Sequence, residues 1–490
     1  MFTPASMVEP FPQNAPFLYE QITDRISRLI EGGTLRPGER VPSVRKLSAL
    51  HRVSISTVLQ AYRLLESRGL IEARPQSGYF VRHRRWTPPP EPEIALPEPG
   101  AAEVEISKLV MQVVRDNQHS SLMRLGATCA NPSHHPAARV HRSLASVARR
   151  CLRHEILFDP IQGVPALRVQ IARRAVDAGC TLSPNEIVVT SGATEAMHCC
   201  LRAVAEPGDP IAIEAPTYFG ILHLIESLGM RAVEIATYPR EGVCLEALER
   251  ALDRERIKAC LFVLNFNNPL GSCVPDEKKK KLVSLLSRRG IPLIENDIYG
   301  DLAHTEPRPR AAKAFDQDGL VLLCDSFNKT LSRGYRVGWV APGRFRERVE
   351  FLKFVSTDGT ASVTQMAIAD FLCNGGYDNH LRKLRRFYAD QVRRMTKAVA
   401  CHFPPGTKVT RPAGGEVLWI ELARGADSMN VYRRALRKGI AIAPGTIFSV
   451  KQQYRNYIRL NCGVPWTAAV EDAVRQLGKI ASDSLSRRAG

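Results

Sequence analysis

Near the start of the chain, apolar residues recur three and four positions apart, with polar residues between them. This spacing predicts an amphipathic helix over about 17–31. The apolar positions of this stretch are Leu18, Ile22, Ile26, Leu29 and Ile30. Two shorter stretches with the same spacing begin at Ser43 and Ser54, and serine favours the N-cap of a helix. Short β-forming runs at 70–73 and 79–81 complete the order helix, helix, turn, helix and β-hairpin, which is typical of a winged helix-turn-helix.

From about residue 106 onward, short apolar runs alternate with helical segments. Such runs suit strands that are buried on both faces, and their alternation with helices predicts an α/β domain with a mainly parallel sheet. The predicted strands span 186–190, 210–214, 260–265, 291–295 and 320–324. Ligands of such sheets gather at the carboxyl ends of the strands. Binding or catalytic residues are therefore expected among the polar residues that follow these runs.

A proline-rich stretch separates the two patterns. Six of the 33 prolines fall between Pro88 and Pro99, and proline cannot pair within a helix or a central strand. We expect three parts: a small domain over 1–86, a semi-rigid linker over 87–105 and a large domain over 106–490. The net charge of +19 divides into +6 on the first 86 residues and +13 on the other 404. Positive charge is thus about twice as dense in the small domain.

Length and composition set the class of protein. The 490 residues are 44% apolar and 24% charged, which is typical of a folded protein of several domains. No stretch approaches the roughly 18 uncharged apolar residues that a membrane span needs. The twelve cysteines show no metal-binding spacing, and His134 and His135 have no companion ligands, so we expect no metal. Reduced cysteines and the lack of a signal peptide indicate a cytoplasmic protein.

The small domain carries residues that suit contacts with DNA. A helix capped by Ser54 presents free N–H groups and the positive end of its dipole to a phosphate. Ser56 and Thr57 lie one turn inside this helix, where they can reach a base edge or a phosphate. Arg40 and Arg45 add positive charge beside them. The alternative is a small three-helix module whose basic residues are simply solvated.

Several runs in this part resemble the GntR family of bacterial DNA-binding regulators. They are Pro37-Gly38-Glu39-Arg40-Val41-Pro42-Ser43-Val44-Arg45-Lys46-Leu47, Val53-Ser54-Ile55-Ser56-Thr57-Val58, Ala61-Tyr62-Arg63-Leu64-Leu65-Glu66 and Gly69-Leu70-Ile71. The resemblance implies double-stranded DNA as partner, with Arg45, Ser54, Ser56, Thr57 and Gly78 near it. Many members of the family carry Arg or Lys where this chain has Ile55.

Polar residues cluster after three of the strands predicted in the large domain. They stand in the runs Asn265–Gly271, Glu295–Tyr299 and Asp325–Thr330, and the last run is followed by Arg333-Gly334-Tyr335-Arg336. Neither a P-loop nor a GxGxxG motif is present, so nucleotide binding of those types is not indicated. A lysine beside an aspartate and an arginine is also compatible with an ordinary cluster of salt bridges.

Together these runs resemble the fold-type I aminotransferases, which use pyridoxal 5′-phosphate (PLP). The motifs are Ser-x-x-Lys-x6-Arg at Ser326, Asn-Pro-x-Gly at Asn268 and Asp-x-Tyr at Asp297. The resemblance implies a large α/β domain with a smaller C-terminal α+β subdomain. It also implies that Lys329 forms the Schiff base with PLP and that Asp297 keeps the ring nitrogen protonated.

The same resemblance assigns the other contacts of the cofactor and of its ligand. Tyr299 and Asn268 hydrogen-bond the ring oxygen, and Tyr218 stacks on the ring. Arg336, Ser326 and the backbone of Ala193 and Thr194 hold the phosphate. Arg459 binds the carboxylate of a substrate or effector. Phe158 stands where the family usually has a Tyr that reaches the phosphate of the neighbouring subunit's cofactor.

A GntR-type reader joined to an aminotransferase-like domain resembles the MocR subfamily of transcriptional regulators. This implies a PLP-dependent regulator that responds to an amino-acid or amine effector. It also implies a symmetric homodimer on paired half-sites. An active aminotransferase that carries a DNA-binding module is the alternative, because the residues needed for the half-reaction are present. A third reading is a degenerate domain that binds no PLP, which the presence of Lys329, Asp297 and Arg336 disfavours.

Overall fold

The computed structural model describes residues 17–31, 34–35, 38–75, 77–82, 88–119, 121–127, 136–151 and 160–486. The chain forms two compact units, Met1–Thr87 and Pro88–Gly490. The first five elements build the smaller unit, and all later elements belong to the larger one.

The smaller unit is a winged helix-turn-helix, as predicted. It consists of α1 (Leu18–Glu31), α2 (Val44–His51), α3 (Ile55–Ser67) and the antiparallel hairpin of β1 (Ile71–Arg74) and β2 (Gly78–Val81). Both predicted caps form, because Ser43 accepts the N–H of Lys46 and Ser54 accepts the N–H of Thr57. Tyr62 is fully buried at the centre, and its hydroxyl donates to the carbonyl of Pro42.

The larger unit is built on an eight-stranded sheet with the order β4-β11-β10-β9-β8-β5-β6-β7. The strands are β4 (Val188–Thr190), β5 (Pro210–Ala215), β6 (Arg231–Tyr238), β7 (Gly242–Val243), β8 (Ala259–Phe262), β9 (Leu293–Asn296), β10 (Val321–Ser326) and β11 (Gly338–Ala341). β11 runs antiparallel to both of its neighbours and β7 runs antiparallel to β6, whereas all other pairs are parallel. The predicted mainly parallel sheet is confirmed.

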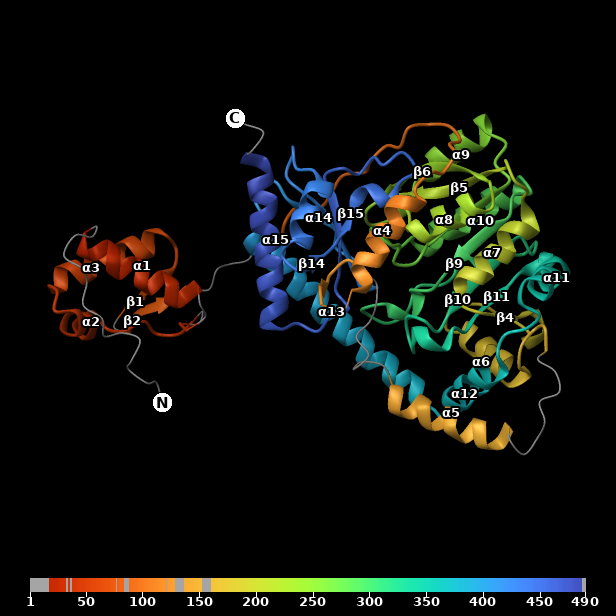
Figure 1. Ribbon diagram of the computed structural model, residues 1–490, viewed down its shortest axis with the longest axis horizontal. Coiled ribbons are helices and arrows are strands. Elements are labelled where there is room, and N and C mark those ends of the chain that lie inside the picture. The colour runs from red at the N-terminus through yellow and green to blue at the C-terminus, as the bar shows by residue number, and fades with distance from the viewer. Residues whose placement is uncertain are drawn as a thin grey trace. The chain divides into compact units, whose positions relative to one another are not determined.

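Helices cover both faces of this sheet (Figure 1). The helices between residues 107 and 402 are α4 (Ser107–Gln118), α5 (Ala137–Cys151), α6 (Pro165–Ala175), α7 (Ala193–Val204), α8 (Phe219–Ser227), α9 (Leu245–Arg254), α10 (Asp276–Arg288), α11 (Arg346–Thr357), α12 (Ser362–Cys373) and α13 (Gly376–His402). On β9, Ile294 packs in the core that includes α7, and Leu293 packs in the core that includes α10. Successive residues of this strand therefore face different layers of helices.

A smaller subdomain at the C-terminal end contains a second, antiparallel sheet with the order β12-β13-β16-β15. Its strands are β12 (Lys408–Val409), β13 (Val417–Glu421), β15 (Ala443–Pro444) and β16 (Tyr457–Asn461), and its helices are α14 (Ser428–Leu436) and α15 (Ala468–Ser486). These elements are blue in Figure 1 and lie together at one side of the larger unit. β3 (Met123–Arg124) pairs with β14 (Ile440–Ala441), so an early segment contributes to this region. The expected α+β subdomain is confirmed.

The proline-rich segment lies along the larger unit from Pro88 onward. The carbonyl of Pro90 accepts the N–H of Val409 at 2.8 Å. Glu91 accepts hydrogen bonds from Arg240, one of them 2.8 Å long, and forms an ion pair of 3.1 Å with Arg411. Prolines cannot donate hydrogen bonds, so the acceptors and carboxylates of this segment hold it in place.

Candidate cofactor site

A cavity lies at the carboxyl ends of β9 and β10, beside the N-terminus of α7. Its lining consists of Ala193, Thr194, Met197, Tyr218, Val263, Asn268, Asn296, Ile298, Tyr299, Asn328, Lys329, Arg333 and Arg336. We call it the lysine cavity. Seven of the predicted cofactor residues meet here: Ala193, Thr194, Tyr218, Asn268, Tyr299, Lys329 and Arg336.

The amine of Lys329 pairs with a buried carboxylate. Lys329 follows β10 and is 8% exposed, and its Nζ donates to Oε1 of Glu416, which is fully buried. The amine also lies 5.2 Å from the centre of the Tyr299 ring. Glu416 belongs to the segment just before β13, so the smaller subdomain reaches into the site. The sequence places Glu416 after two glycines, but that pattern does not reveal its pairing with Lys329.

Hydrogen bonds link the cavity to Arg459. Asn268 donates through Nδ2 to the hydroxyl of Tyr299 at 3.2 Å, and its Oδ1 accepts from Nη1 of Arg459 at 3.1 Å. Arg459 also donates to the carbonyl of Gly126 and is 1% exposed. A ligand that changes the position of Arg459 therefore also changes the hydrogen bonding of Asn268.

The mouth of the cavity is suited to an anion. α7 begins at Ala193, and the free N–H groups of its first turn favour a phosphate. Gly192 before it has φ +93°, and an added Cβ would lie 3.1 Å from Nη2 of Arg336. Arg336 itself donates to the carbonyl of Ser191 at 2.8 Å. At Gly338 an added Cβ would lie 2.5 Å from the carbonyl carbon of Gly192, so only glycine permits this close approach.

Buried polar atoms without partners surround the same cavity. Among the described residues, Oδ1 of Asn296, Oδ1 of Asn328 and Oε2 of Glu416 make no hydrogen bond. Buried polar atoms are nearly always satisfied, so three exceptions in one place indicate a ligand. A buried amine, an anion-binding helix end and a tyrosine wall match the aldehyde, the phosphate and the ring of PLP. Burial raises the pKa of Tyr218, which keeps that wall uncharged.

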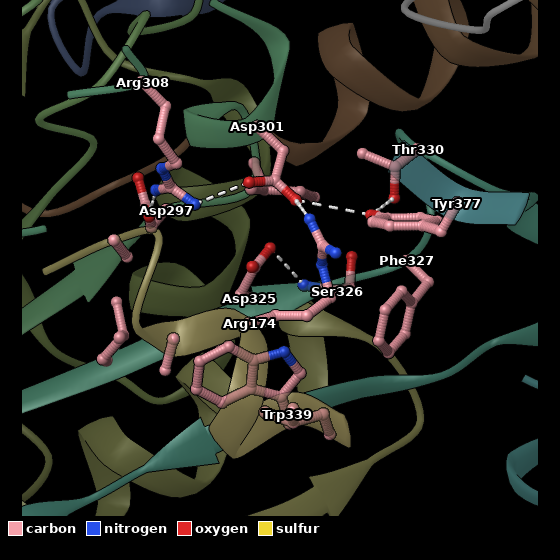
Figure 2. A pocket seen from close by; sticks show the side chains of 15 residues that line it. Arg174, Asp297, Asp301, Arg308, Asp325, Ser326, Phe327, Thr330, Trp339 and Tyr377 are labelled. Carbon is pink, nitrogen blue, oxygen red and sulfur yellow. Dashed lines mark hydrogen bonds and ion pairs between the residues drawn. The ribbon is translucent and has the colours of Figure 1, made fainter. Parts of the chain in front are cut away.

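Asp297 is not among the residues that line the lysine cavity. It lies in a neighbouring cluster, which we call the aspartate cluster and which consists of Arg174, Asp297, Asp301, Arg308 and Asp325. Figure 2 shows these side chains pointing toward one another. Arg308 pairs with Asp297 and, at 2.7 Å, with Asp301. The cavity between them measures about 30 Å³, which is space for water-sized molecules only.

The charged groups of the aspartate cluster shift one another's pKa values. Burial alone would lower the pKa of Arg308, but Asp297 and Asp301 raise it. Burial would raise the pKa of Asp301, yet the arginines Arg308 and Arg174 lower it. Burial and the nearby Asp297 raise the pKa of Asp325 well above its ordinary value. The cluster therefore combines a carboxyl group whose pKa is lowered, that of Asp301, with one whose pKa is raised, that of Asp325.

Two further predictions concern Ser326 and Phe158. Ser326 ends β10 and is 4% exposed, but it borders the aspartate cluster, and its hydroxyl accepts the N–H of Asn328 at 3.4 Å. Phe158 lies outside the described residues. Asn328 and Arg333, to which the sequence assigned no role, line the lysine cavity.

Of the predicted DNA contacts in the smaller unit, Arg40, Arg45, Ser54 and Ser56 are exposed, and Thr57 and Gly78 are half-buried. Arg45 is exposed on α2, and the hydroxyls of Ser54, Ser56 and Thr57 form one group, in which Ser54 lies 2.7 Å from each of the other two. Gly78, at φ +98°, opens β2, and an added Cβ there would lie 3.2 Å from the guanidinium of Arg40. Ile55, the first residue of α3, is 49% exposed.

Each of the two units matches a family of known proteins. Residues 18–81 match the bacterial regulatory proteins of the gntR family, and residues 141–477 match aminotransferase class I and II. The uncharacterized HTH-type transcriptional regulator YjiR of Escherichia coli (strain K12) is 39% identical over 463 residues, which cover 94% of this chain and 98% of YjiR. Within the described residues, none of the helices is long and apolar enough to cross a membrane.

Solved structures resemble the larger unit. Kynurenine aminotransferase of Pyrococcus horikoshii, solved in complex with PMP, is 26% identical with a TM-score of 0.72, covering 77% of this chain and 95% of that one. LysN, the α-aminoadipate aminotransferase of Thermus thermophilus, was solved with N-(5′-phosphopyridoxyl)-L-leucine. It is 25% identical with a TM-score of 0.69, covering 78% of this chain and all of LysN.

Proposed function

Because the chain belongs to the HTH-type transcriptional regulators that join a GntR domain to an aminotransferase class I and II domain, the MocR arrangement, we propose that it is a regulator controlled by PLP and by an amino compound. The smaller unit binds double-stranded DNA. The larger unit holds PLP at Lys329, and PLP supplies an aldehyde that captures amines reversibly. The observation that carries this proposal is the buried amine of Lys329 among polar atoms that have no hydrogen-bond partner in the described part of the chain.

Each part of the cofactor has a matching group in the lysine cavity. Ala193, Thr194 and Arg336 surround the position for a phosphate, and Tyr218 forms a wall for the ring. The resemblance to aminotransferases assigns the ring oxygen to the pair Asn268 and Tyr299. Because Arg459 donates to Asn268, an effector carboxylate at Arg459 would act on the same hydrogen bonds.

Allosteric control requires that the effector bind one conformation of the protein better than another. We propose a symmetric homodimer, in which two readers occupy paired half-sites, as the assembly that converts effector binding into altered DNA affinity. Sedimentation at micromolar concentration tests this assembly, and a monomer at that concentration would contradict it.

Lys329→Ala tests the cofactor site. The wild-type protein mixed with PLP should show the visible absorption band of a lysine-bound cofactor, and the variant should not. Lys280→Ala removes an exposed lysine of α10 and serves as the matched control. An unchanged band in Lys329→Ala would refute the assignment. Fast turnover of an amino donor with a 2-oxo acid would favour an active aminotransferase instead.

Arg45→Ala tests the reader. The duplex is one that the wild-type protein selects from a random-sequence library, and anisotropy is recorded at several salt concentrations. If Arg45 contacts a phosphate, affinity should fall and the salt dependence should weaken by about one ion. Arg256→Ala, an exposed arginine of the larger unit, should leave both quantities unchanged. Equal affinities of Arg45→Ala and wild type would remove Arg45 from the interface.

A further inference from the structure

Strand alternation decides which residue of β9 faces the lysine cavity. Ile294 packs in the core beside α7, and Asn296, two positions later, lines the lysine cavity. Glu295 lies on the opposite face, where its carboxylate accepts the N–H groups of Ala312 and Lys313 at 2.7 and 3.0 Å. Asp297 follows the last residue of β9, and its N–H donates to the carbonyl of Cys324 on β10 at 2.9 Å, which continues the strand pairing. Its side chain therefore points the same way as that of Glu295, away from the lysine cavity.

The contacts of Asp297 agree with this direction. Its Oδ1 accepts from Asn265 at 2.7 Å, and its Oδ2 pairs with Arg308. Both oxygens are therefore occupied by protein donors, Asn265 and Arg308. Asn296, by contrast, is 4% exposed, and its Oδ1 makes no hydrogen bond within the described part of the chain.

The positions of the substituents on the PLP ring indicate which part of the cofactor Asn296 faces. In PLP the ring nitrogen lies para to the carbon that bears the aldehyde, so it points away from Lys329. The phosphate belongs at the start of α7, and the ring oxygen belongs with Asn268 and Tyr299. Of the remaining lining residues, Met197, Val263 and Ile298 are apolar and Arg333 is exposed. Asn328 is half-buried and lies at the phosphate end, where its Nδ2 is 3.3 Å from the position of a Cβ added at Gly192. Asn296 is the buried polar group that remains.

We propose that Asn296, and not Asp297, faces the ring nitrogen of PLP, and that this nitrogen consequently stays unprotonated at neutral pH. The proposal rests on the proposed function, since it presupposes PLP in the lysine cavity. A carboxylate stabilises a protonated nitrogen by its charge. An amide is neutral and supplies no charge that would hold a proton on the ring nitrogen. A half-turn of the amide exchanges its oxygen and nitrogen, and Nδ2 can then donate a hydrogen bond to the lone pair of an unprotonated nitrogen.

This assignment has a consequence for function. A protonated ring withdraws electrons strongly from a bound amino compound, whereas an unprotonated ring withdraws them weakly. The site then retains the capture of amines through the aldehyde but promotes removal of the Cα proton poorly. A chain with Asn296 at this place is suited to sensing an amine rather than consuming it.

The test is nitrogen NMR of PLP labelled with ¹⁵N in the ring and bound to the full chain. The wild-type protein should give the chemical shift of an unprotonated pyridine. Asn296→Asp introduces the missing charge and should move the resonance to the position of a protonated ring. Asp297→Asn is the matched control, and its resonance should stay with that of the wild type.

Each outcome decides the proposal. A protonated ring in the wild-type protein would overturn it even if neither variant folds, and so would a shift in Asp297→Asn without one in Asn296→Asp. If the wild type takes up no labelled PLP, the proposed function fails and this inference fails with it. Bound PLP with a protonated ring leaves the proposed function intact and refutes only the role of Asn296.

Discussion

The lysine cavity and the aspartate cluster lie next to each other at the ends of β9 and β10, yet they differ in how completely their polar and charged groups are paired. In the aspartate cluster, Arg308 pairs with two carboxylates, and the space between the groups measures only about 30 Å³. In the lysine cavity, one lysine faces one glutamate, and three polar atoms around them lack partners within the described residues. The first arrangement is complete by itself, and the second requires a ligand.

The difference shows why a conspicuous group of charges is a poor guide to a binding site. Buried ion pairs are stable only when every member is compensated, and a compensated cluster has nothing left to offer a ligand. Asp297 stands in a motif that resembles a cofactor site, but its oxygens are taken by Arg308 and Asn265. Its neutral neighbour Asn296 retains an acceptor without a partner among the described residues.

The largest effect that separates the two regions should come from Arg308→Met. Removal of the buried guanidinium leaves Asp297 and Asp301 without their main counter-charge, which costs about 3–5 kcal/mol in the free energy of unfolding. Urea titration measures this loss. Arg336→Met at the mouth of the lysine cavity is the control, and it should weaken PLP binding with little change in stability. Comparable stability losses in both variants would mean that the two regions do not differ as described.

A matched pair of variants tests the charges inside the aspartate cluster. The pKa of Asp301 is lowered from 3.8, so its ionised form adds stability above pH 3.8, and this is lost as the pH falls through the folded pKa. Asp301→Asn should therefore cost about 2 kcal/mol near neutral pH and progressively less in acid.

Asp325→Asn should show the opposite trend. The pKa of Asp325 is raised above 3.8, so the native state keeps a proton that the unfolded chain releases. The contribution of Asp325 to the free energy of unfolding therefore falls as the pH rises above 3.8. In that range the variant should become more stable relative to the wild type. Unfolding free energies across pH measure both trends, and parallel curves for the two variants would contradict opposite protonation states.

The smallest effect should come from Glu416→Gln in the lysine cavity. A carboxylate beside an amine favours the ammonium form, and only the neutral amine attacks the aldehyde of PLP. The amide keeps the shape of the side chain but removes its charge, so the covalent attachment of PLP to Lys329 should become several-fold faster at neutral pH. Stopped-flow absorbance after mixing with PLP records the rate. Slower attachment would mean that Glu416 assists the reaction instead.

The elements of the fold could be predicted because their signals are local. The caps Ser43 and Ser54 act on N–H groups three residues away, and helical spacing places the apolar face of α1 within a few turns. The buried runs of the central sheet are equally visible, although the run expected to end at Glu295 continues to Asn296. Most residues expected around Lys329 meet there because they follow strands whose ends share one edge.

The amino-acid sequence by itself determined two units, the elements of the smaller one, five buried strands of the larger one and most of the residues that gather around Lys329. Periodicity, capping and apolar runs depend on near neighbours and are therefore visible in the sequence. Only the tertiary structure decided that Glu416 pairs with Lys329 and that Asn296 lines the cavity while Asp297 joins Arg308. The reason is that adjacent residues of a strand face opposite ways. Which way each one faces depends on where α7 and α10 pack, and that is settled by contacts distant in the sequence.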